Sequence, residues 1–214
     1  MTRPNSSHTG KRRRNRARAD AAPSLTRGQR AECEQAIAHR FKTPELLDRA
    51  MTHRSATQGR AAEWSNERLE FLGDRVLGLV IVETLLERFP GAREGELAPR
   101  LNALVSRETC AVVGAELGLG RFLIVDRSER ASGGNNKPTL LANAAEALIG
   151  AVYLDGGLKA AAKFILPPGT PPPRVARGPQ GAAARGRHGQ AATTLMTRQA
   201  QSATRPAPTR AARD

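Results

Sequence analysis

Hydrophobic and acidic positions separate most clearly between residues 63 and 89. At about 100° per residue, as an α-helix requires, Glu67, Glu70 and Asp74 fall on one narrow stripe. The opposite face of the same helix is apolar, and its members are Leu69, Leu72, Val76, Leu79 and Val80. The pattern therefore predicts an amphipathic helix that buries one face in a core and presents three carboxylates on the other.

The sequence also marks the ends of this helix. Ser65 or Asn66 is suited to the N-cap position, and a Pro-Gly pair directly after Phe89 predicts where the helix stops. From Leu77 onward the acidic stripe turns apolar as well. We therefore expect the helix to run from an acidic end that solvent reaches into an end that is fully packed.

Helical spacing of apolar residues also appears in six other stretches, at 25–41, 43–50, 94–105, 106–117, 139–157 and 158–166. Thr43, Ser106 and Thr139 are expected to cap three of these helices. The short apolar run 122–125 has no partner with which to form a sheet, so we expect an extended or turn-like connection there. The composition of residues 132–136 predicts a flexible loop. Together these patterns predict an all-α domain.

The acidic stripe requires a neutralising partner. Like charges three or four residues apart on a helix repel each other, and the stripe contains no Lys or Arg to offset them. One interpretation is an ordinary solvated acidic face. The other is a site for hard divalent cations, which prefer carboxylate oxygens. The clean separation of acidic from apolar positions favours the second interpretation.

A second set of oxygen-bearing side chains lies in the predicted helix 139–157. Asn143 and Glu146 are three residues apart and share one face, while Ala145, Ala147 and Gly150 would let another helix approach closely. If this helix packs against the acidic stripe, the two sets form an oxygen-lined site on facing helices that suits an ion such as Mg²⁺.

Charge is distributed unevenly along the 214 residues, whose formal net charge is +14. The head, residues 1–22, carries +6 and the tail, residues 167–214, carries +7, whereas residues 23–166 carry only +1. Head and tail contain few apolar residues, so we expect both to be disordered and basic. The sequence thus predicts one folded domain over 23–166, with flanks that attract phosphate.

The compartment follows from what the sequence lacks. It has no apolar run long enough to span a membrane and no secretory signal at its start, so we expect no membrane partner. Cys33 and Cys110 are isolated, without the spacing of a metal or disulfide motif. Reduced thiols of this kind are typical of a cytoplasmic protein.

Residues 66–74, Asn-Glu-Arg-Leu-Glu-Phe-Leu-Gly-Asp, resemble the signature of the ribonuclease III family. Residues 51–55 and 138–157 resemble two further motifs of that family. The resemblance implies a ribonuclease III-type helical endonuclease domain over residues 23–166. Family members usually carry a double-stranded-RNA-binding domain after it, and nothing in residues 167–214 resembles one.

The resemblance also implies roles for individual residues. It implies catalytic roles for Asp74 and Glu146. It implies Mg²⁺ as the cofactor, for which Mn²⁺ can substitute. The implied metal site is formed by Glu70, Asp74, Asn143 and Glu146. The family has an acid where this chain has Asn143, a departure that removes one charge and is expected to lower metal affinity or rate.

Three further residues are assigned less directly. The resemblance implies that Glu67 and Glu94 support substrate or subunit contacts, although from the pattern alone Glu94 is an ordinary acidic residue in a first helical turn. His53 has no acid or nucleophile spaced to partner it. For His53 we therefore favour a packing or hydrogen-bonding role over that of a catalytic base.

The function implied by the resemblance is hydrolysis of phosphodiester bonds in double-stranded RNA, leaving 5′-phosphate and 3′-hydroxyl ends, by a homodimer that takes part in rRNA and mRNA processing. Two alternatives remain open. One is a catalytically weak or inactive RNA-binding or ribosome-associated protein that retains the nuclease fold, which Asn143 favours. The other is an unrelated helical dimerisation module, which residues 66–74 disfavour.

Overall fold

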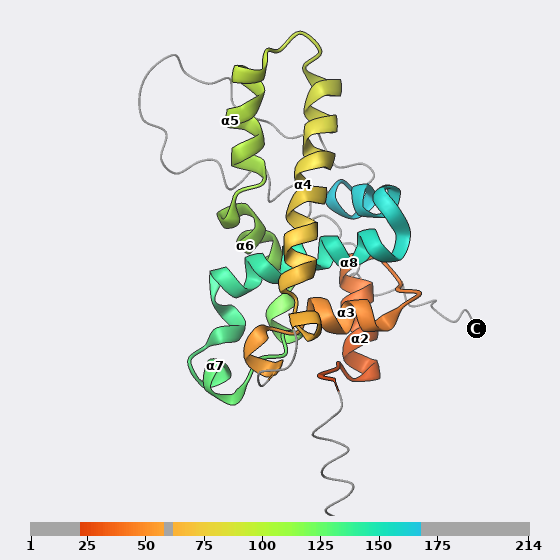
Figure 1. The fold of residues 1–214 in the computed structure, drawn as a ribbon, viewed down its shortest axis with the longest axis vertical. Helices are drawn as coiled ribbons and strands as arrows, with labels where there is room; N and C mark the ends of the chain where they lie inside the picture. Colours follow the sequence, from red (N-terminus) through yellow and green to blue (C-terminus); the bar gives the residue numbers. More distant parts are fainter. Residues whose placement is uncertain (1–21, 58–61, 168–214) are drawn as a thin grey trace, which may run out of the picture.

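The structure is a computed structural model that describes residues 22–57 and 62–167, and within these ranges its regular elements are helices (Figure 1). The one β-bridge in the described ranges joins Thr52 and Ile124. This confirms the predicted all-α class and the extended connection at 122–125. The helices are α2 (Arg27–Ile37), α3 (Pro44–Ala50), α4 (Glu67–Arg88), α5 (Glu94–Leu104), α6 (Arg107–Glu116), α7 (Arg127–Ala131) and α8 (Pro138–Ile165). Short 3₁₀ turns are η1 (Arg54–Thr57), η2 (Ala62–Trp64), η3 (Leu119–Arg121) and η4 (Gly134–Asn136).

The centre of the fold is the crossing of α4 and α8, and glycines make it close. A Cβ atom on Gly73 of α4 would lie 1.7 Å from the backbone oxygen of Glu146, and one on Gly150 of α8 would lie 2.3 Å from that of Leu69. No side chain fits at either position. Gly150, one of the small residues of the predicted helix 139–157, therefore allows the close approach of a second helix that the sequence predicted.

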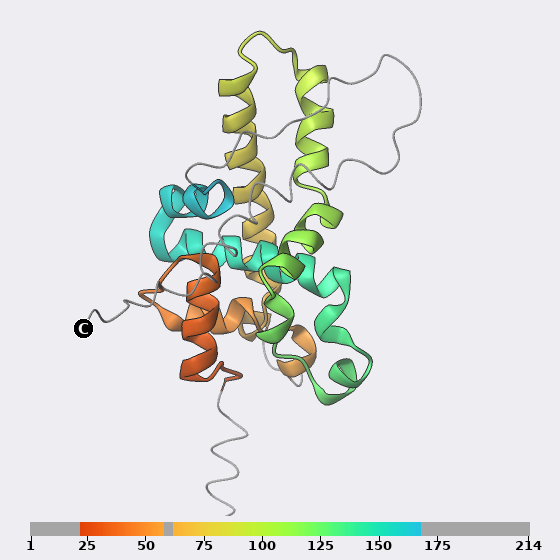
Figure 2. The same cartoon turned by 180° about the vertical axis from the view of Figure 1, so that it is seen from behind.

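α8 is the most buried element, and three other helices pack around it. α6 approaches it at Gly114, where a Cβ would lie 2.6 Å from the backbone oxygen of Leu141. α2 and α3 cover another side, where the buried carboxylate of Asp155 accepts hydrogen bonds from the backbone N–H groups of Lys42 and Thr43 at 3.0 Å. Seen from behind, α8 runs across the middle of the molecule (Figure 2).

The second half of α4 and α5 project together from the body as a two-helix arm (Figures 1 and 2). On this arm Leu79 is 48 % exposed and Leu86 is 53 % exposed. Two expectations were therefore wrong: Leu79 does not belong to the buried face, and this end of α4 is not fully packed. The reason is tertiary, because neighbouring elements cover only one side of α4 in the arm, where Leu77, Ile81 and Leu85 are buried.

Three of the four predicted N-cap residues occupy that position, and one of the three makes a capping hydrogen bond. The hydroxyl of Ser106 accepts a hydrogen bond from the backbone N–H of Thr109 at 3.2 Å, as expected. Asn66 and Thr43 occupy N-cap positions, but neither side chain makes a capping hydrogen bond. Thr139 lies inside α8, because Pro138 pre-sets the helical φ and moves the start of the helix forward to follow Lys137.

Two boundaries near the end of the domain also bear on the predictions. Gly157 has φ +75° and interrupts α8, which confirms separate helical segments on its two sides. The helix α7 was not predicted, although Asp126 caps it by accepting a hydrogen bond from the backbone N–H of Glu129 at 2.7 Å. The expected flexible loop at 132–136 contains the turn η4, in which the Asn135 amide donates to the backbone oxygen of Gly120 at 2.9 Å.

The proposed head and tail lie outside the described residues, apart from Ala22 and Pro167. The described helices include none whose length and hydropathy would suit a membrane-spanning segment.

Candidate active site

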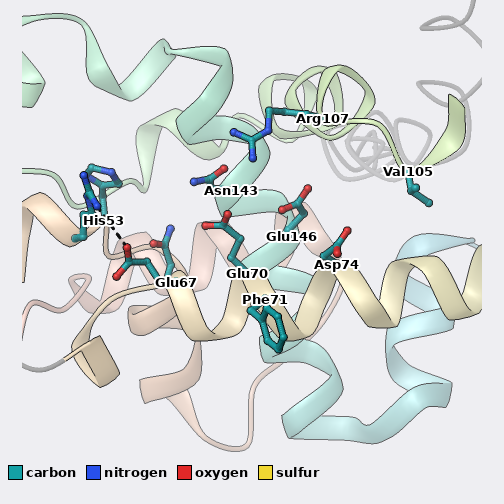
Figure 3. A pocket seen from close by; sticks show the side chains of 11 residues that line it. His53, Glu67, Glu70, Phe71, Asp74, Val105, Arg107, Asn143 and Glu146 are labelled. Atoms are coloured by element: carbon teal, nitrogen blue, oxygen red, sulfur yellow. Dashed lines mark ion pairs between the residues drawn. The ribbon is translucent and has the colours of Figure 1, made fainter. Parts of the chain in front are cut away.

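An open cavity of about 690 Å³ lies where α4, α8 and the start of α6 meet (Figure 3). Its lining is polar, with carboxylates on one side and basic groups around them. The lining residues are His53, Arg54, Asn66, Glu67, Glu70, Phe71, Asp74, Val105, Arg107, Asn143 and Glu146. The structure thus brings together five of the six residues that the sequence singled out, and it places them in one cavity that solvent reaches.

α4 contributes the acidic stripe along its first turns. Glu67 accepts a hydrogen bond from the Ser65 hydroxyl at 3.1 Å and lies 3.8 Å from the guanidinium of Arg54. Asp74, one turn beyond Glu70, forms an ion pair with the neighbouring Arg75. The stripe is therefore partly neutralised from outside, although it contains no basic residue of its own.

α8 contributes Asn143 and Glu146 from the opposite wall. Glu146 is only 8 % exposed, and the thiol of Cys110 on α6 neighbours its carboxylate. The Oδ1 atom of Asn143 is buried and has no hydrogen-bond partner in the described part of the chain. An unsatisfied buried oxygen is costly, so this atom marks a place where a hydrogen-bond donor or a cation would be favourable.

Burial and mutual repulsion shift the protonation of two of these carboxyl groups. Burial raises the pKa of Glu70, and the charges of Glu67 and Asp74 add to it, while Arg107 acts in the opposite direction. Burial also raises the pKa of Glu146, with Glu70 and Asp74 adding to it. Raised carboxyl pKa values mean that the ionised forms of these groups are destabilised in the folded protein. A bound cation would stabilise the ionised forms.

The types of side chain in this cavity fit the predicted metal site, whereas the distances between them do not. The donors are all oxygens, as hard cations prefer, and one of them is the orphaned Oδ1 of Asn143. Across residues 22–57 and 62–167, however, no three Asp, Glu, His or Cys side chains lie close enough together to hold one ion. Binding would require Asp74 to exchange its partner Arg75 for the ion.

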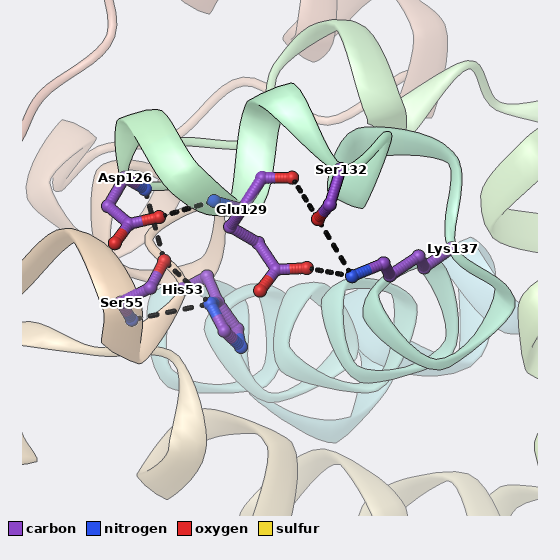
Figure 4. Close-up of polar contacts among 6 residues, drawn as sticks. All are labelled: His53, Ser55, Asp126, Glu129, Ser132 and Lys137. Atoms are coloured by element: carbon purple, nitrogen blue, oxygen red, sulfur yellow. Dashed lines mark hydrogen bonds and ion pairs between the residues drawn. The ribbon is translucent and has the colours of Figure 1, made fainter.

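His53 borders the cavity and is held by a hydrogen-bond network that reaches α7 (Figure 4). Its Nδ1 atom accepts from the backbone N–H of Ser55 and lies 3.0 Å from the Ser55 hydroxyl, which itself accepts from the backbone N–H of Asp126 at 3.0 Å. Burial lowers the pKa of His53. The network therefore favours a neutral imidazole with its proton on Nε2, in agreement with the hydrogen-bonding role that the sequence favoured.

Glu94 is the one singled-out residue that the structure does not bring to the cavity. It begins α5 at the tip of the arm and is exposed. Its suggested role in substrate or subunit contacts stays a prediction, and within one copy of the chain it cannot belong to the same constellation as Glu70 and Glu146.

Sequence reasoning missed Arg107, which reaches into the cavity from the first position of α6 (Figure 3). A cation at a helix N-terminus opposes the helix dipole, but Arg27 and Arg127 begin α2 and α7 in the same way. This feature alone therefore does not distinguish Arg107 in the sequence.

Comparison with known proteins agrees with the fold. The pattern of the family described as Ribonuclease-III-like matches residues 43–168. Ribonuclease 3 of Dinoroseobacter shibae is 58 % identical over 137 residues, which are 64 % of this chain and 58 % of that protein. Ribonuclease 3 of Caulobacter vibrioides is 54 % identical over 135 residues, or 63 % of this chain and 58 % of that protein.

A solved structure extends the comparison to three dimensions. The nuclease domain of ribonuclease III from Campylobacter jejuni, which has a flexible region involved in dimer formation, superposes with a TM-score of 0.58 at 39 % sequence identity. The match covers 62 % of this chain and 90 % of that one. The chain thus spans somewhat less than three fifths of the curated relatives' length and nearly all of a solved nuclease domain. From its family pattern, its relatives and its fold, the chain belongs to the ribonuclease-III-like family.

Proposed function

We propose that this chain is an endoribonuclease that hydrolyses phosphodiester bonds of double-stranded RNA in a reaction that depends on Mg²⁺, and that residues 23–166 are its nuclease domain. One observation carries the proposal: oxygen-bearing side chains from α4 and α8 face each other across one open cavity. Family membership raises the weight of that observation. The products are 5′-phosphate and 3′-hydroxyl ends, and the setting is rRNA and mRNA processing in the cytoplasm.

Four residues would hold the ion: Glu70, Asp74, Asn143 and Glu146. When bound, a divalent cation supplies an acidified water and compensates the negative charge that develops on the phosphate. The chain contributes the placement of the ligands. The rigid crossing at Gly73 and Gly150 fixes the distance between the walls, and the thiol of Cys110 neighbours the carboxylate of Glu146.

Asp74 and Glu146 are the proposed catalytic residues, and they differ in what restrains them. Asp74 is paired with an exposed arginine, so its side chain is free to turn toward the cavity. Glu146 is nearly enclosed and has the Cys110 thiol beside it. Glu67, which is tied to Arg54 at the mouth of the cavity, has the place of a residue that orients RNA rather than a metal ligand.

We also propose that the chain acts as a homodimer. Phe71 on α4 is 69 % exposed and points away from the acids (Figure 3). A recess beside it is lined by Leu69, Leu72 and Leu154 and, at its polar side, by Arg49, Arg68 and Glu67. An exposed aromatic ring next to a partly apolar recess is a surface of the kind that protein interfaces use. Because Phe71 also borders the acidic cavity, the interface would adjoin the site.

A second candidate function is a weakly active or inactive RNA-binding protein that retains the nuclease fold. Two observations favour it. Asn143 supplies no charge to the site, and Asp74 is engaged by Arg75 in an ion pair.

A cleavage assay separates the two candidates. Long duplex RNA is incubated at low salt with the wild type, with Glu146→Ala and with Asn143→Asp, each with Mg²⁺ and with a chelator. The proposed enzyme cuts only with Mg²⁺, loses cutting in Glu146→Ala, and retains or gains rate in Asn143→Asp. Duplex binding without cutting by the wild type, together with cutting by Asn143→Asp, would instead identify an attenuated nuclease that serves in RNA binding.

A further inference from the structure

Arg107 is a charged residue of the cavity lining to which the proposed function gives no role. It is the first residue of α6, directly after the cap Ser106, and its guanidinium points toward Asn143 and Glu146 (Figure 3). α6 packs on α8 through Gly114, so the position of Arg107 relative to the acids is fixed by the core. The side chain therefore stands in the cavity on a rigid support.

The surroundings of Arg107 leave its hydrogen-bonding groups available. In the described part of the chain, ion pairs engage Arg30, Arg54, Arg75, His39 and Lys137, and none of them involves Arg107. The positive charge of Arg107 lowers the pKa of Glu70 and of Glu146. It does so through space, without an ion pair to either carboxylate. If Arg107 served as the counter-ion of the acids, its guanidinium would form an ion pair with one of the carboxylates. The structure shows no such ion pair in the described part of the chain.

The cavity presents a difficulty for an RNA substrate that Arg107 can resolve. A phosphodiester carries one negative charge, and Glu67, Glu70, Asp74 and Glu146 all face the same space. A phosphate approaching this wall is repelled unless a cation meets it from the other side. The fork of an arginine offers parallel N–H donors to two phosphate oxygens, which a lysine cannot reproduce.

We propose that Arg107 binds a non-bridging oxygen pair of an RNA phosphate in the cavity and so positions the substrate against the acids, an inference that rests on the proposed nuclease function. In this role Arg107 contacts substrate, whereas the carboxylates hold the ion. Its unfavourable place at the N-terminus of α6 is then explained by the direction in which that position aims the side chain.

The test compares Arg107→Gln and Arg107→Lys with the matched control Arg127→Gln. Arg127 is also exposed, also follows a helix cap and lies outside the cavity lining. Single-turnover cleavage of duplex RNA at low salt is measured over a series of protein concentrations. We expect Arg107→Gln either to raise the protein concentration for half-maximal cleavage or to lower the maximal cleavage rate, by about 10- to 100-fold. Loss of a charged hydrogen bond has an effect of this size. Arg107→Lys should fall between, and Arg127→Gln should change less than about twofold.

Two further readouts distinguish a phosphate contact from a counter-ion of the acids. The first is RNA binding without divalent ions, measured over a series of salt concentrations. The slope of the logarithm of the binding constant against the logarithm of salt concentration should become shallower by about one in Arg107→Gln only. Unchanged RNA binding and cleavage with tighter Mg²⁺ binding would make Arg107 a counter-ion and overturn the proposal, as would equal losses in Arg127→Gln. If the wild type neither binds nor cuts duplex RNA, the proposed function fails first and this inference fails with it.

Discussion

Asn143 is the residue at which the proposed metal site is weakest. Its Oδ1 atom is buried and has no hydrogen-bond partner in the described chain, yet an amide oxygen brings no charge. Asn143→Asp would add a carboxylate at the same position. We predict that it lowers the Mg²⁺ concentration for half-saturation by about tenfold, since one added charge near a divalent ion is worth ~1.4 kcal/mol.

The measurement is thermal unfolding over a Mg²⁺ titration, without RNA, so that binding is read separately from catalysis. Asn143→Ala is the matched control, because it removes the oxygen and should weaken Mg²⁺ binding. If all three proteins respond to Mg²⁺ alike, the side chain at position 143 does not reach the ion.

Glu146 makes a prediction about stability and pH. Burial raises its pKa in the folded state, so on a rise in pH the unfolded chain loses this proton first. The folded protein therefore loses stability as pH rises through the interval between the unfolded and the folded pKa. Glu146→Gln avoids that loss, and we expect a higher Tm than the wild type at pH 7 in chelator, with no gain at pH 4.

Each kcal/mol so recovered is worth about 2–4 °C in Tm for a chain of this size. Exposed Glu87 on the arm supplies the control Glu87→Gln, which should leave Tm unchanged. Added Mg²⁺ should reverse the order by stabilising the wild type more than Glu146→Gln. A variant less stable than the wild type at pH 7 in chelator would contradict the electrostatic account.

Sequence reasoning reached the acids and missed the arginine, for a physical reason. The stripe on α4 follows from helical spacing alone, because its members are local to one helix. That Asn143 and Glu146 face this stripe depends on which helices cross, and the small residues and the family resemblance supplied that step. Arg107 lies on a third helix, and local pattern carries no information on where α6 aims its first side chain.

At the scale of elements, the α4–α8 crossing decides whether a site exists. Gly73 lies between Glu70 and Asp74, and an added Cβ would clash with the backbone of Glu146 itself. We predict that Gly73→Ala costs at least ~1–3 kcal/mol in the free energy of unfolding. Gly78, further along the same helix, has open space at its Cβ, so Gly78→Ala should be neutral or stabilising by up to ~1 kcal/mol.

Urea unfolding of the two variants beside the wild type measures both changes. The comparison is strict, since the same substitution is made twice in one helix and only the neighbour differs. Equal effects at the two positions would mean that the helices are not in backbone contact at Gly73, and the facing walls of the cavity would then lie further apart.

Element positions were predictable to a greater extent than element environments. Helical periodicity located α3, α4, α5, α6 and α8, because periodicity and turn residues are local signals. Burial on the arm was not predictable from them. Leu79 has the spacing of a core residue, yet it is 48 % exposed because it lies on the side of α4 that faces away from the buried positions of the arm.

At the scale of the whole molecule, exposed apolar residues and the acidic cavity occupy adjoining parts of α4, which links assembly to function. Phe71 borders both the acidic cavity and the partly apolar recess. If two copies pair through this surface, each ring fills the recess of the other and two cavities face one duplex from the same side. A cut in each strand then requires the dimer.

The change Phe71→Glu tests this arrangement, because it removes the ring that would contact Leu69, Leu72 and Leu154 of the partner's recess. We predict that it weakens the dimer by about 30-fold or more, the effect of losing a central aromatic contact, and that double-strand cutting falls with it. Sedimentation equilibrium measures the association, and Leu86→Glu, exposed to a similar degree at the far end of the arm, is the control. A Phe71→Glu protein that stays dimeric would place the interface elsewhere, whereas a monomeric wild type would separate this site from the two-strand mechanism altogether.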